Sequence, residues 1–520
     1  MKKLFFLFAI SISSFTANAQ VATWADQAAC VIYTRCTSCH NPNGIAKNQS
    51  FVDYFDAISY AQEIDSFVQH NIMPPWPPDQ NYQTYAHEKV LTQDEKDVIH
   101  NWVINGTQQG NMQNAPTPPV YASTALIANP DVTAQMQLYQ IPPITTDLYR
   151  CFVIQNVNAV DKFISGLEVI PGNRNIVHHV LVFADQGNTV INLDNADPGP
   201  GYTAFGGIGS NSAELLGVWA PGGEANFFPT GMGIKLKANS HIILQIHYPI
   251  GTSGQWDSTK VNLKWSTSGF TREVAIDPIL NHGDLNEGFL YIPADSMRTF
   301  TCDYTVPANV TLLACAPHMH LVGTEIRAHG ITPLNDTLRL VDIPKWDFHW
   351  QNMYWFRKPM KVPQGTVLHS EAIYNNTASN PFNPNSPPQP VYLGEATTDE
   401  MMLIYFYWTI YLPGDENIIV DTSTSVPAYN GCNFSLGGTE NWLQSQYSIY
   451  PNPANEIINI NVGWREAYTI TIYDVAGRVV LRKENLVGKE SLLLTDFSKG
   501  CYIVELNNNS NKFNSKLILN

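Results

Sequence analysis

Two cysteines three positions apart, followed directly by a histidine, constrain the start of this chain more than any other feature. The run is Cys36-Thr37-Ser38-Cys39-His40. This spacing is typical of covalent haem c attachment, in which each thiol forms a thioether to the porphyrin and the histidine binds the iron. A disulfide or half of a zinc site is the alternative, but no second cysteine pair lies nearby. The run therefore predicts one haem c, attached at Cys36 and Cys39, with His40 as an axial ligand.

The sequence around this motif predicts a small all-α domain. Helical spacing of apolar residues is found at 25–36 and 52–70. A last helix has Thr92 as a possible N-cap, Glu95 three residues later and Gly106 where a C-terminal cap would lie. These patterns predict helices on both sides of the haem motif.

A proline-rich loop, residues 71–78, contains Met73. Its prolines hold the backbone extended, so the loop can present Met73 rigidly to the haem. We expect Met73 to be the second axial ligand, and His70 or His87 to take that place if Met73 is a core residue. The segment resembles a small class I cytochrome c, which implies the pair His40 and Met73. A thioether ligand favours reduced iron and raises the potential.

The chain beyond a Pro-rich linker changes to short alternating or apolar runs separated by Gly, Pro and Asn, as in 163–170 and 241–248. Such runs are typical of antiparallel β-sandwiches. Histidines are placed in them as His178-His179, His247 and His318-Met319-His320. Positions two apart on a strand share a face, so His318 and His320 can bind one ion, whereas adjacent histidines need a bulge or a strand end.

Together these histidine runs resemble the copper type II monooxygenases, the family of peptidylglycine α-hydroxylating and dopamine β-monooxygenases. The resemblance covers roughly 147–432. It also includes Gln245-Ile246-His247-Tyr248, which matches the family's Gln-x-His-Tyr element, and a Thr-Thr-Asp-Glu-Met run ending at Met401. The resemblance implies two copper ions. The electron-transfer copper would be held by His178, His179 and His247, and the oxygen-binding, catalytic copper by His318, His320 and Met401.

Imidazole tolerates both copper oxidation states, and one weak thioether favours Cu(I) and leaves room for dioxygen. Met402 is the alternative to Met401, because adjacent strand residues face opposite ways. Gln245 is a candidate for a residue that supports the copper ligands. The resemblance suggests a disulfide between Cys302 and Cys432, and Cys315 is expected to be a small buried hydrophobe.

The ends of the chain predict export. Met1-Lys2-Lys3, an apolar run and Ala17-Asn18-Ala19 are typical of a signal peptide cleaved before Gln20. The last domain, beginning at Tyr447-Ser448-Ile449-Tyr450-Pro451-Asn452-Pro453, resembles the C-terminal sorting domain of the type IX secretion system, which implies that machinery as a partner. We expect a secreted or cell-surface protein that passes through the periplasm and the outer membrane. No run reaches the roughly 18 apolar residues of a membrane anchor.

The net charge of −16 argues against a nucleic-acid partner. We expect a multidomain chain with a small all-α cytochrome c domain, two antiparallel copper sandwiches and a small C-terminal β-sandwich. The expected parts are a signal peptide (1–19), the cytochrome c domain (20–112), a linker (113–130), the first sandwich (131–272), the second sandwich (273–438) and the sorting domain (439–520).

The combined motifs predict a secreted copper monooxygenase. It would hydroxylate a C–H bond of an organic substrate with dioxygen, while the fused haem relays electrons from an external donor. Two alternatives are a non-catalytic haem and copper electron carrier and a copper-binding surface protein. A carrier would have closed coordination shells without access for dioxygen. A copper-binding protein would take up copper without oxidising the haem when oxygen is added. The intact Met401 element favours the enzyme.

Overall fold

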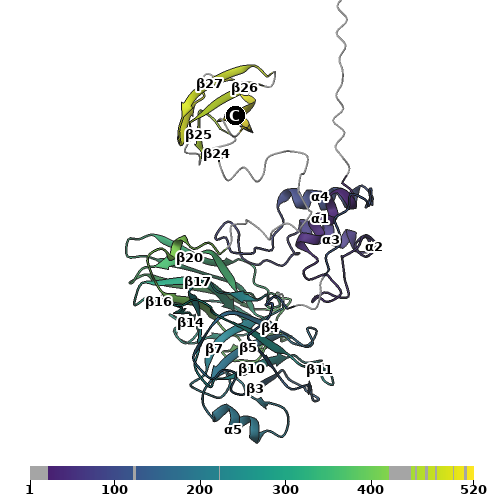
Figure 1. The fold of residues 1–520 in the computed structure, drawn as a ribbon, viewed down its shortest axis with the longest axis vertical. Helices are drawn as coiled ribbons and strands as arrows, with labels where there is room; N and C mark the ends of the chain where they lie inside the picture. Colours follow the sequence, from purple (N-terminus) through teal and green to yellow (C-terminus); the bar gives the residue numbers. More distant parts are fainter. Residues whose placement is uncertain are drawn as a thin grey trace, which may run out of the picture. The chain divides into compact units, whose positions relative to one another are not determined.

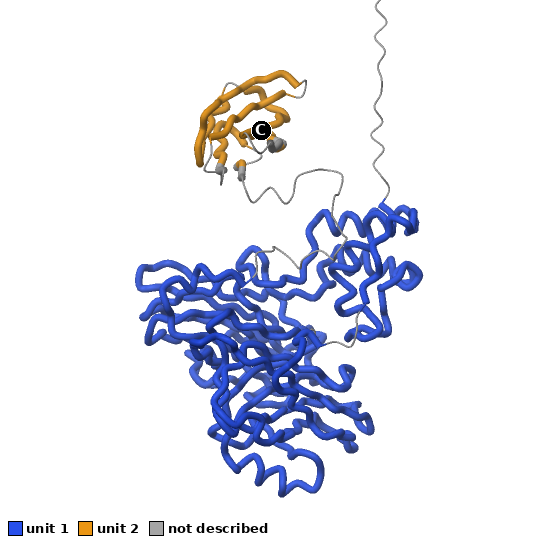
Figure 2. The backbone as a smooth tube through the Cα atoms, viewed as in Figure 1, with its two compact units in different colours: residues 1–432 blue, residues 433–520 orange. Residues whose placement is uncertain are grey.

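The computed structural model of the chain consists mainly of β-strands (Figure 1). Its contacts divide the chain into two units, residues 1–432 and 433–520 (Figure 2). The predicted signal peptide, 1–19, lies outside the described residues. The described residues are 22–120, 125–221, 223–420, 447–450, 454–462, 467–474, 477–495, 497–508 and 512–519.

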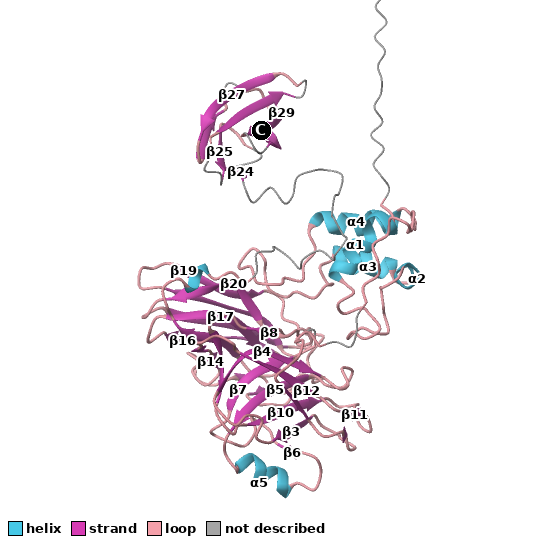
Figure 3. Cartoon of the chain, in the orientation of Figure 1, coloured by secondary structure: helices cyan, strands magenta, loops and turns pink. Residues whose placement is uncertain are grey.

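Five short helices lie in residues 22–120 (Figure 3). They are η1 (Trp24–Ala28, a π-helix), α1 (Ala29–Arg35), α2 (Tyr54–Ile58), α3 (Ala61–Gln69) and α4 (Gln93–Ile104). The predicted helix 52–70 is interrupted, because Tyr60 has φ −120° and ψ 13°, outside the helical region. The predicted start of α4 is confirmed. Thr92 Oγ1 accepts the Glu95 N–H and the Glu95 carboxylate accepts the Thr92 N–H, so two donors at the helix end are satisfied.

A buried ion pair joins the first and last of these α-helices. Arg35, the last residue of α1, donates from Nε (3.0 Å) and Nη2 (2.8 Å) to Glu95 of α4. Both side chains are about 5% exposed or less. The pair directly precedes Cys36, so it fixes the start of the Cys36–His40 run against α4.

The loop between α3 and α4 packs onto the second sandwich of the same unit. Tyr85 is fully buried in that sandwich's core, its hydroxyl donates to Leu340 O at 2.7 Å, and it forms an isolated β-bridge with Phe356. Trp76 packs against the same core. Asp79 N donates to Asp342 O at 2.8 Å. The loop therefore holds the helical segment on the second sandwich.

The first sandwich has two antiparallel main sheets, apart from one parallel strand pair at an edge. One sheet has the order β1-β12-β4-β9-β13, with β8 also paired to β4, and the other has the order β6-β3-β10-β5-β7. Side chains of both sheets meet in one apolar core. The strands are β1 (Val132–Gln135), β2 (Tyr139–Gln140), β3 (Leu148–Ile154), β4 (Lys162–Ile170), β5 (His179–Asp185), β6 (Tyr202–Thr203), β7 (Glu214–Trp219), β8 (Asn226–Phe227), β9 (Met232–Leu236), β10 (His241–Tyr248), β11 (Trp256–Asp257), β12 (Lys260–Trp265) and β13 (Arg272–Glu273), with β2 and β11 paired and α5 (Thr189–Ala196) between β5 and β6.

The second sandwich repeats this arrangement. Its sheets have the orders β14-β23-β17-β20 and β16-β21-β18-β19, and they enclose a second apolar core. The strands are β14 (Ala275–Asn281), β15 (Tyr291–Ile292), β16 (Ser296–Thr305), β17 (Val310–His318), β18 (Gly323–Ile331), β19 (Thr337–Ile343), β20 (Tyr354–Val362), β21 (Val367–Asn376), β22 (Val391–Tyr392) and β23 (Leu403–Ile410), with β15 and β22 paired and the 3-10 helix η2 (Asp415–Asn417) following β23. The predicted β-sandwiches are confirmed.

The predicted disulfide between Cys302 and Cys432 is wrong, because Cys302 is a free cysteine. Its side chain is fully buried among the apolar residues of the second core. Cys432 lies outside the described residues. Cys315 is also free and fully buried, as predicted, and its thiol points to Leu340 O at 3.8 Å.

The second unit is a small β structure with its own apolar core. Its two sheets have the orders β24-β25-β28 and β27-β26-β29-β30. The strands are β24 (Tyr447–Tyr450), β25 (Ile457–Val462), β26 (Tyr468–Asp474), β27 (Val479–Leu486), β28 (Lys489–Leu493), β29 (Gly500–Asn507) and β30 (Lys512–Leu519). Among the described residues of the whole chain, no helix has the length and hydrophobicity needed to cross a bilayer.

Candidate metal centres

Three histidines meet at one edge of the first sandwich. His247 lies near the end of β10 and pairs across the ladder with His179, the first residue of β5. His178 directly precedes that strand, and its N–H donates to His247 O at 3.0 Å. The strand end therefore lets both adjacent histidines face the same point. One nitrogen atom of each ring lies within 4.8 Å of the others.

The nitrogen atoms of this group suit a metal ion. Nδ1 of His178 and Nδ1 of His179 lie 3.2 Å apart. Two nitrogens bound to one ion at about 2 Å each lie roughly 3 Å apart, so this spacing fits a shared ion. Both ring nitrogens of His247 are buried without a hydrogen-bond partner, and Nε2 lies 3.3 Å from the Asp147 carboxylate. A buried nitrogen without a partner is costly unless a ligand satisfies it. The three histidines therefore fit a shared metal ion.

A second group lies at the end of β17 in the second sandwich. His318 is the last residue of that strand, and His320 lies two residues beyond it. The expectation that both share a strand face is therefore wrong, yet their ring centroids are 5.0 Å apart. His318 Nδ1 lies 2.5 Å from Gln351 Oε1, and His320 Nδ1 lies 3.1 Å from Asp399 O. Both acceptors place the ring proton on Nδ1 and leave Nε2 free to bind a metal.

Met401 and Met402 occupy different surroundings. Met401 lines the cavity that contains His318 and His320, whereas Met402 is fully buried in the apolar core of the second sandwich. Both lie in the loop before β23 rather than on a strand. Of the two thioethers, only that of Met401 is placed beside the histidines.

The buried Glu400 carboxylate ties this loop to the turn after β17. It accepts the N–H groups of His320 (2.8 Å), Val322 (2.8 Å), Gly323 (3.1 Å) and Met401 (3.1 Å). Burial raises the pKa of Glu400 to about 8, and these four donors oppose that shift. One side chain therefore sets the spacing between the backbones of His320 and Met401.

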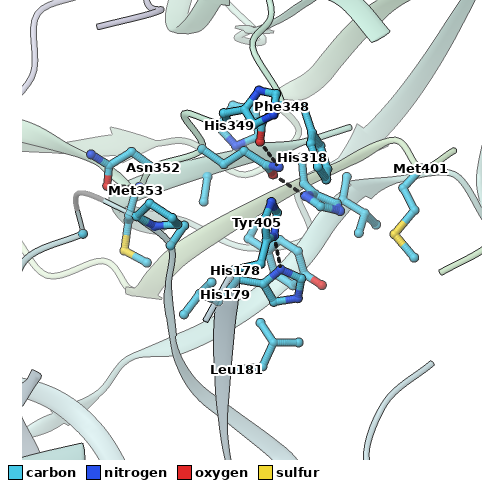
Figure 4. A pocket seen from close by; sticks show the side chains of 18 of the residues that line it. His178, His179, Leu181, His318, Phe348, His349, Asn352, Met353, Met401 and Tyr405 are labelled. Atoms are coloured by element: carbon cyan, nitrogen blue, oxygen red, sulfur yellow. Dashed lines mark hydrogen bonds between the residues drawn. The ribbon is translucent and has the colours of Figure 1, made fainter. Parts of the chain in front are cut away.

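Both groups face one cavity of about 470 Å³ in the first unit (Figure 4). His178, His179, His318, His320 and Met401 line it. Aromatic residues complete much of the wall; among them are Trp76, Tyr149, Phe348, Trp355 and Tyr405. The arrangement places two metal-binding groups around a single space that can admit a small organic molecule.

Four of these histidines, His178, His179, His318 and His320, have lowered pKa values. Burial, with neighbouring histidines, lowers the pKa of His178 to about 3 and that of His320 to about 3. Burial lowers the pKa of His318 to about 4, and it holds the pKa of His179 well below its usual value. Their lone pairs are therefore available to a metal at neutral pH.

The sequence did not predict several residues that contact the candidate metal ligands. Asp147 contacts His247 Nε2 and accepts the Thr397 hydroxyl, which belongs to the loop that carries Met401. The Tyr149 ring stacks on His247 with centroids 4.4 Å apart and planes at 6°, and its hydroxyl donates to Glu395 O at 3.1 Å. Tyr149 pairs with His247 across β3 and β10. These contacts arise from strand register, which no sequence pattern revealed.

The side chain of Gln245 hydrogen-bonds to a loop rather than to the histidines. Its amide donates to Gly207 O at 2.8 Å and to Ala204 O at 3.4 Å. Gln245 is two positions before His247 on β10 and lines the same cavity. Its predicted role in supporting the copper ligands stays a prediction.

A second cavity, of about 610 Å³, is lined by the residues predicted to bind haem. Cys36, Cys39, His40 and Met73 all line it, and both cysteines are free thiols. His40 Nδ1 lies 2.9 Å from Gln49 O, so the ring proton is on Nδ1 and Nε2 can bind iron. Apolar side chains line much of the remainder; among them are Phe51, Ile64, Phe67 and Val68. These residues fit a covalently attached porphyrin.

The alternatives to Met73 lie elsewhere. His70 is the C-cap of α3, and its Nδ1 lies 2.7 Å from Ser66 O. His87 lines the cavity of about 470 Å³. Of these three side chains, only Met73 lines the same cavity as His40. The assignment of Met73 as an iron ligand stays a prediction.

Comparison with protein families gives three matches. Residues 132–252 match the N-terminal domain of the copper type II ascorbate-dependent monooxygenases, and residues 291–424 match their C-terminal domain. Residues 448–520 match the secretion system C-terminal sorting domain. The sorting domain indicates export, with secretion or attachment to the cell surface.

Curated relatives resemble the chain over part of their length. Tyramine beta-hydroxylase of Caenorhabditis briggsae is 22% identical over 270 residues, which cover 48% of this chain and 42% of that protein. DBH-like monooxygenase protein 2 of Mus musculus is 22% identical over 333 residues, which cover 62% of this chain and 48% of that protein. The chain therefore spans less than half the length of these relatives.

Solved structures match only weakly. PorZ, a surface component of the type-IX secretion system of Porphyromonas gingivalis, is 17% identical, with a TM-score of 0.14 over 15% of this chain and 12% of that one. A beta-glucuronidase of Faecalibacterium prausnitzii is 10% identical, with a TM-score of 0.13 over 43% of this chain and 37% of that one. TM-scores this low carry no argument about the fold.

Proposed function

We propose that this chain, which contains the N-terminal and C-terminal domains of a copper type II ascorbate-dependent monooxygenase, is an exported hydroxylase with a fused haem donor. One observation carries the proposal: residues of both groups of candidate copper ligands line one cavity, and the candidate haem residues line a second cavity that shares part of its wall. The substrate would be a small organic molecule with a reactive C–H bond.

His178, His179 and His247 would hold the copper that stores an electron, and His318, His320 and Met401 would hold the copper that binds oxygen. When bound, these ions supply the redox chemistry that inserts one oxygen atom of dioxygen into the C–H bond and releases the other as water. The Asp147 carboxylate, 3.3 Å from His247 Nε2, would restrain the ring of His247. Gln351 and Asp399 orient His318 and His320 in the same way, with Nε2 free.

The cavity walls would position the substrate and exclude water. Tyr405 and Phe348 lie near His318 around the cavity (Figure 4). Lys89, which comes from the loop after α3, forms an ion pair of 3.2 Å with Glu224 of the first sandwich, and both residues line the cavity. The helical segment thus contributes part of the substrate wall. An aromatic wall of this kind suits a weakly polar molecule.

The haem would be attached to Cys36 and Cys39, with His40 and Met73 as axial ligands. When bound, the haem would supply electrons one at a time, as the reduction of two copper ions requires. The hydrogen bond from His40 Nδ1 to Gln49 O leaves Nε2 free, so that it would bind the iron. An external donor would reduce the haem from solution.

The test is metal analysis of the exported, haem-containing protein together with an assay for hydroxylated product. We expect two copper ions per chain and product formation coupled to oxygen consumption. His179→Ala and His320→Ala should each reduce copper content to about one ion per chain and abolish product, because each group would lose one of three ligands. His329→Ala, at a histidine on β18 outside both groups, should leave copper content at two. Equal copper content in all four proteins would refute the ligand assignment.

A further inference from the structure

The two cavities of the first unit share part of their walls. Trp76, His178, Gln351 and Asn352 are among the residues that line both. Of the six candidate copper ligands, only His178 borders both spaces. His179 lines the copper cavity alone, and His247, which is 1% exposed, lines neither. His178 is therefore the candidate copper ligand nearest to the space that the haem would fill.

Position in the chain explains this exposure. His178 directly precedes β5, whereas His179 begins the strand and is held by the ladder to β10. The His178 ring lies against segment 348–352, where Phe348 stacks on it with centroids 5.0 Å apart and planes at 23°. Trp350, Gln351 and Asn352 of the same segment line the haem cavity. The segment and His178 together separate the two spaces.

The same segment also reaches the other histidine group, but less directly. Gln351 contacts His318 Nδ1 at 2.5 Å, and the ring centroids of Phe348 and His320 lie 5.8 Å apart. Neither His318 nor His320 borders the haem cavity. An electron that reached these histidines from the haem would have to cross Gln351 or Phe348 first.

We propose that His178 is the entry point for electrons passing from the haem to the copper centres, so that the three-histidine copper is reduced before the methionine-bound copper. The inference rests on the proposed function. In the step, one electron leaves ferrous iron, which becomes ferric, and one Cu(II) ion held by His178, His179 and His247 becomes Cu(I). No bond forms or breaks, and no proton moves. The rate of electron transfer falls steeply with distance, so a ligand that borders both cavities provides the shortest path.

The experiment uses the full chain loaded with ferric haem and two Cu(II) ions, under anaerobic conditions. A light pulse reduces the haem through a photoexcited flavin, with a sacrificial donor present. Haem absorbance then follows the return to the ferric state, and samples frozen at intervals are examined by electron paramagnetic resonance. We expect the Cu(II) signal of the three-histidine centre to disappear first. The His320→Ala protein, which keeps that centre, identifies its signal and should keep the rapid haem reoxidation.

Two matched variants separate the path from the loss of copper. His178→Ala and His179→Ala each remove one ligand from the same centre, but only the first removes a side chain between the cavities. At equal copper occupancy, set by titration, His178→Ala should slow haem reoxidation by about tenfold or more relative to His179→Ala. His329→Ala, at a histidine on β18 that lines neither cavity, should leave this rate within about twofold of the native rate.

Each outcome has a defined meaning. Earlier loss of the other copper signal, or equal slowing by His178→Ala and His179→Ala, would overturn the entry point while leaving the haem relay in place. If the haem is not reoxidised but ascorbate still supports hydroxylation, the relay is wrong and the hydroxylase stands. Absence of hydroxylation with either reductant would refute the proposed function itself.

Discussion

Removing the Asp147 carboxylate should weaken one copper site and spare the other. Asp147 lies 3.3 Å from His247 Nε2 and accepts the Thr397 hydroxyl, and its side chain is 13% exposed. The carboxylate restrains the His247 ring from the side of Nε2. Asp147→Ala leaves His247 free to rotate or to change tautomer, so the ring is no longer held in place for metal binding. The loss of such a supporting carboxylate typically costs about 10–100-fold in metal affinity, or roughly 1.4–2.7 kcal/mol.

The assay is a copper titration against a competing chelator, which reports the affinities of the two sites separately. We expect Asp147→Ala to weaken the three-histidine site by about 10–100-fold. Asp147→Asn should recover part of that loss, because the amide oxygen can still accept from Nε2. Thr397→Val removes only the contact behind Asp147 and should have a smaller effect. Equal weakening of both sites, or no weakening of either, would refute the assignment of Asp147 as a residue that orients His247.

Three further outcomes follow from the described contacts. Arg35→Ala breaks a buried ion pair and should destabilise the helical segment by about 3–5 kcal/mol, measured by denaturant unfolding followed by haem absorbance. Arg478→Ala breaks an exposed pair and should change stability by less than about 1 kcal/mol. Burial alone would raise the pKa of Asp415, but Arg272 holds that pKa below its usual value. The pair therefore stabilises the fold above about pH 4, and this stabilisation is lost as the pH falls through the lowered pKa. Asp415→Asn should flatten the pH dependence of the unfolding midpoint in that acidic range. Met73→His should lower the haem reduction potential in a potentiometric titration, because a thioether favours ferrous iron, and an unchanged potential would show that another side chain binds the iron.

The sandwich architecture could be predicted because strand periodicity is local. Alternating and apolar runs at 163–170 and 241–248 became β4 and β10 with little change in their bounds. The start of α4 was equally predictable, because the Thr92 and Glu95 side chains act on backbone groups three residues away. Such signals need no knowledge of distant parts of the chain.

The candidate ligands could be found because metal-binding chemistry restricts residue type and spacing. The side chains that contact these ligands could not be predicted from the sequence. Asp147 reaches His247 through the register of β3 and β10, and Gln351 reaches His318 from a loop 33 positions later. These contacts exist only after the sandwiches have packed. The disulfide prediction failed for a related reason, since it was transferred by resemblance and Cys302 points into an apolar core.

Through Tyr85, the helical segment also contributes to the stability of the second sandwich. Because this ring fills part of the interior of the second sandwich and donates to Leu340 O, a truncated protein that begins after α4 would carry a vacancy where an aromatic side chain had been. Losing a phenyl-sized group from a protein interior typically costs about 3–5 kcal/mol. The helical segment is thus part of the core of the second sandwich, and a shortened protein meant to isolate the sandwiches should retain residues 74–91.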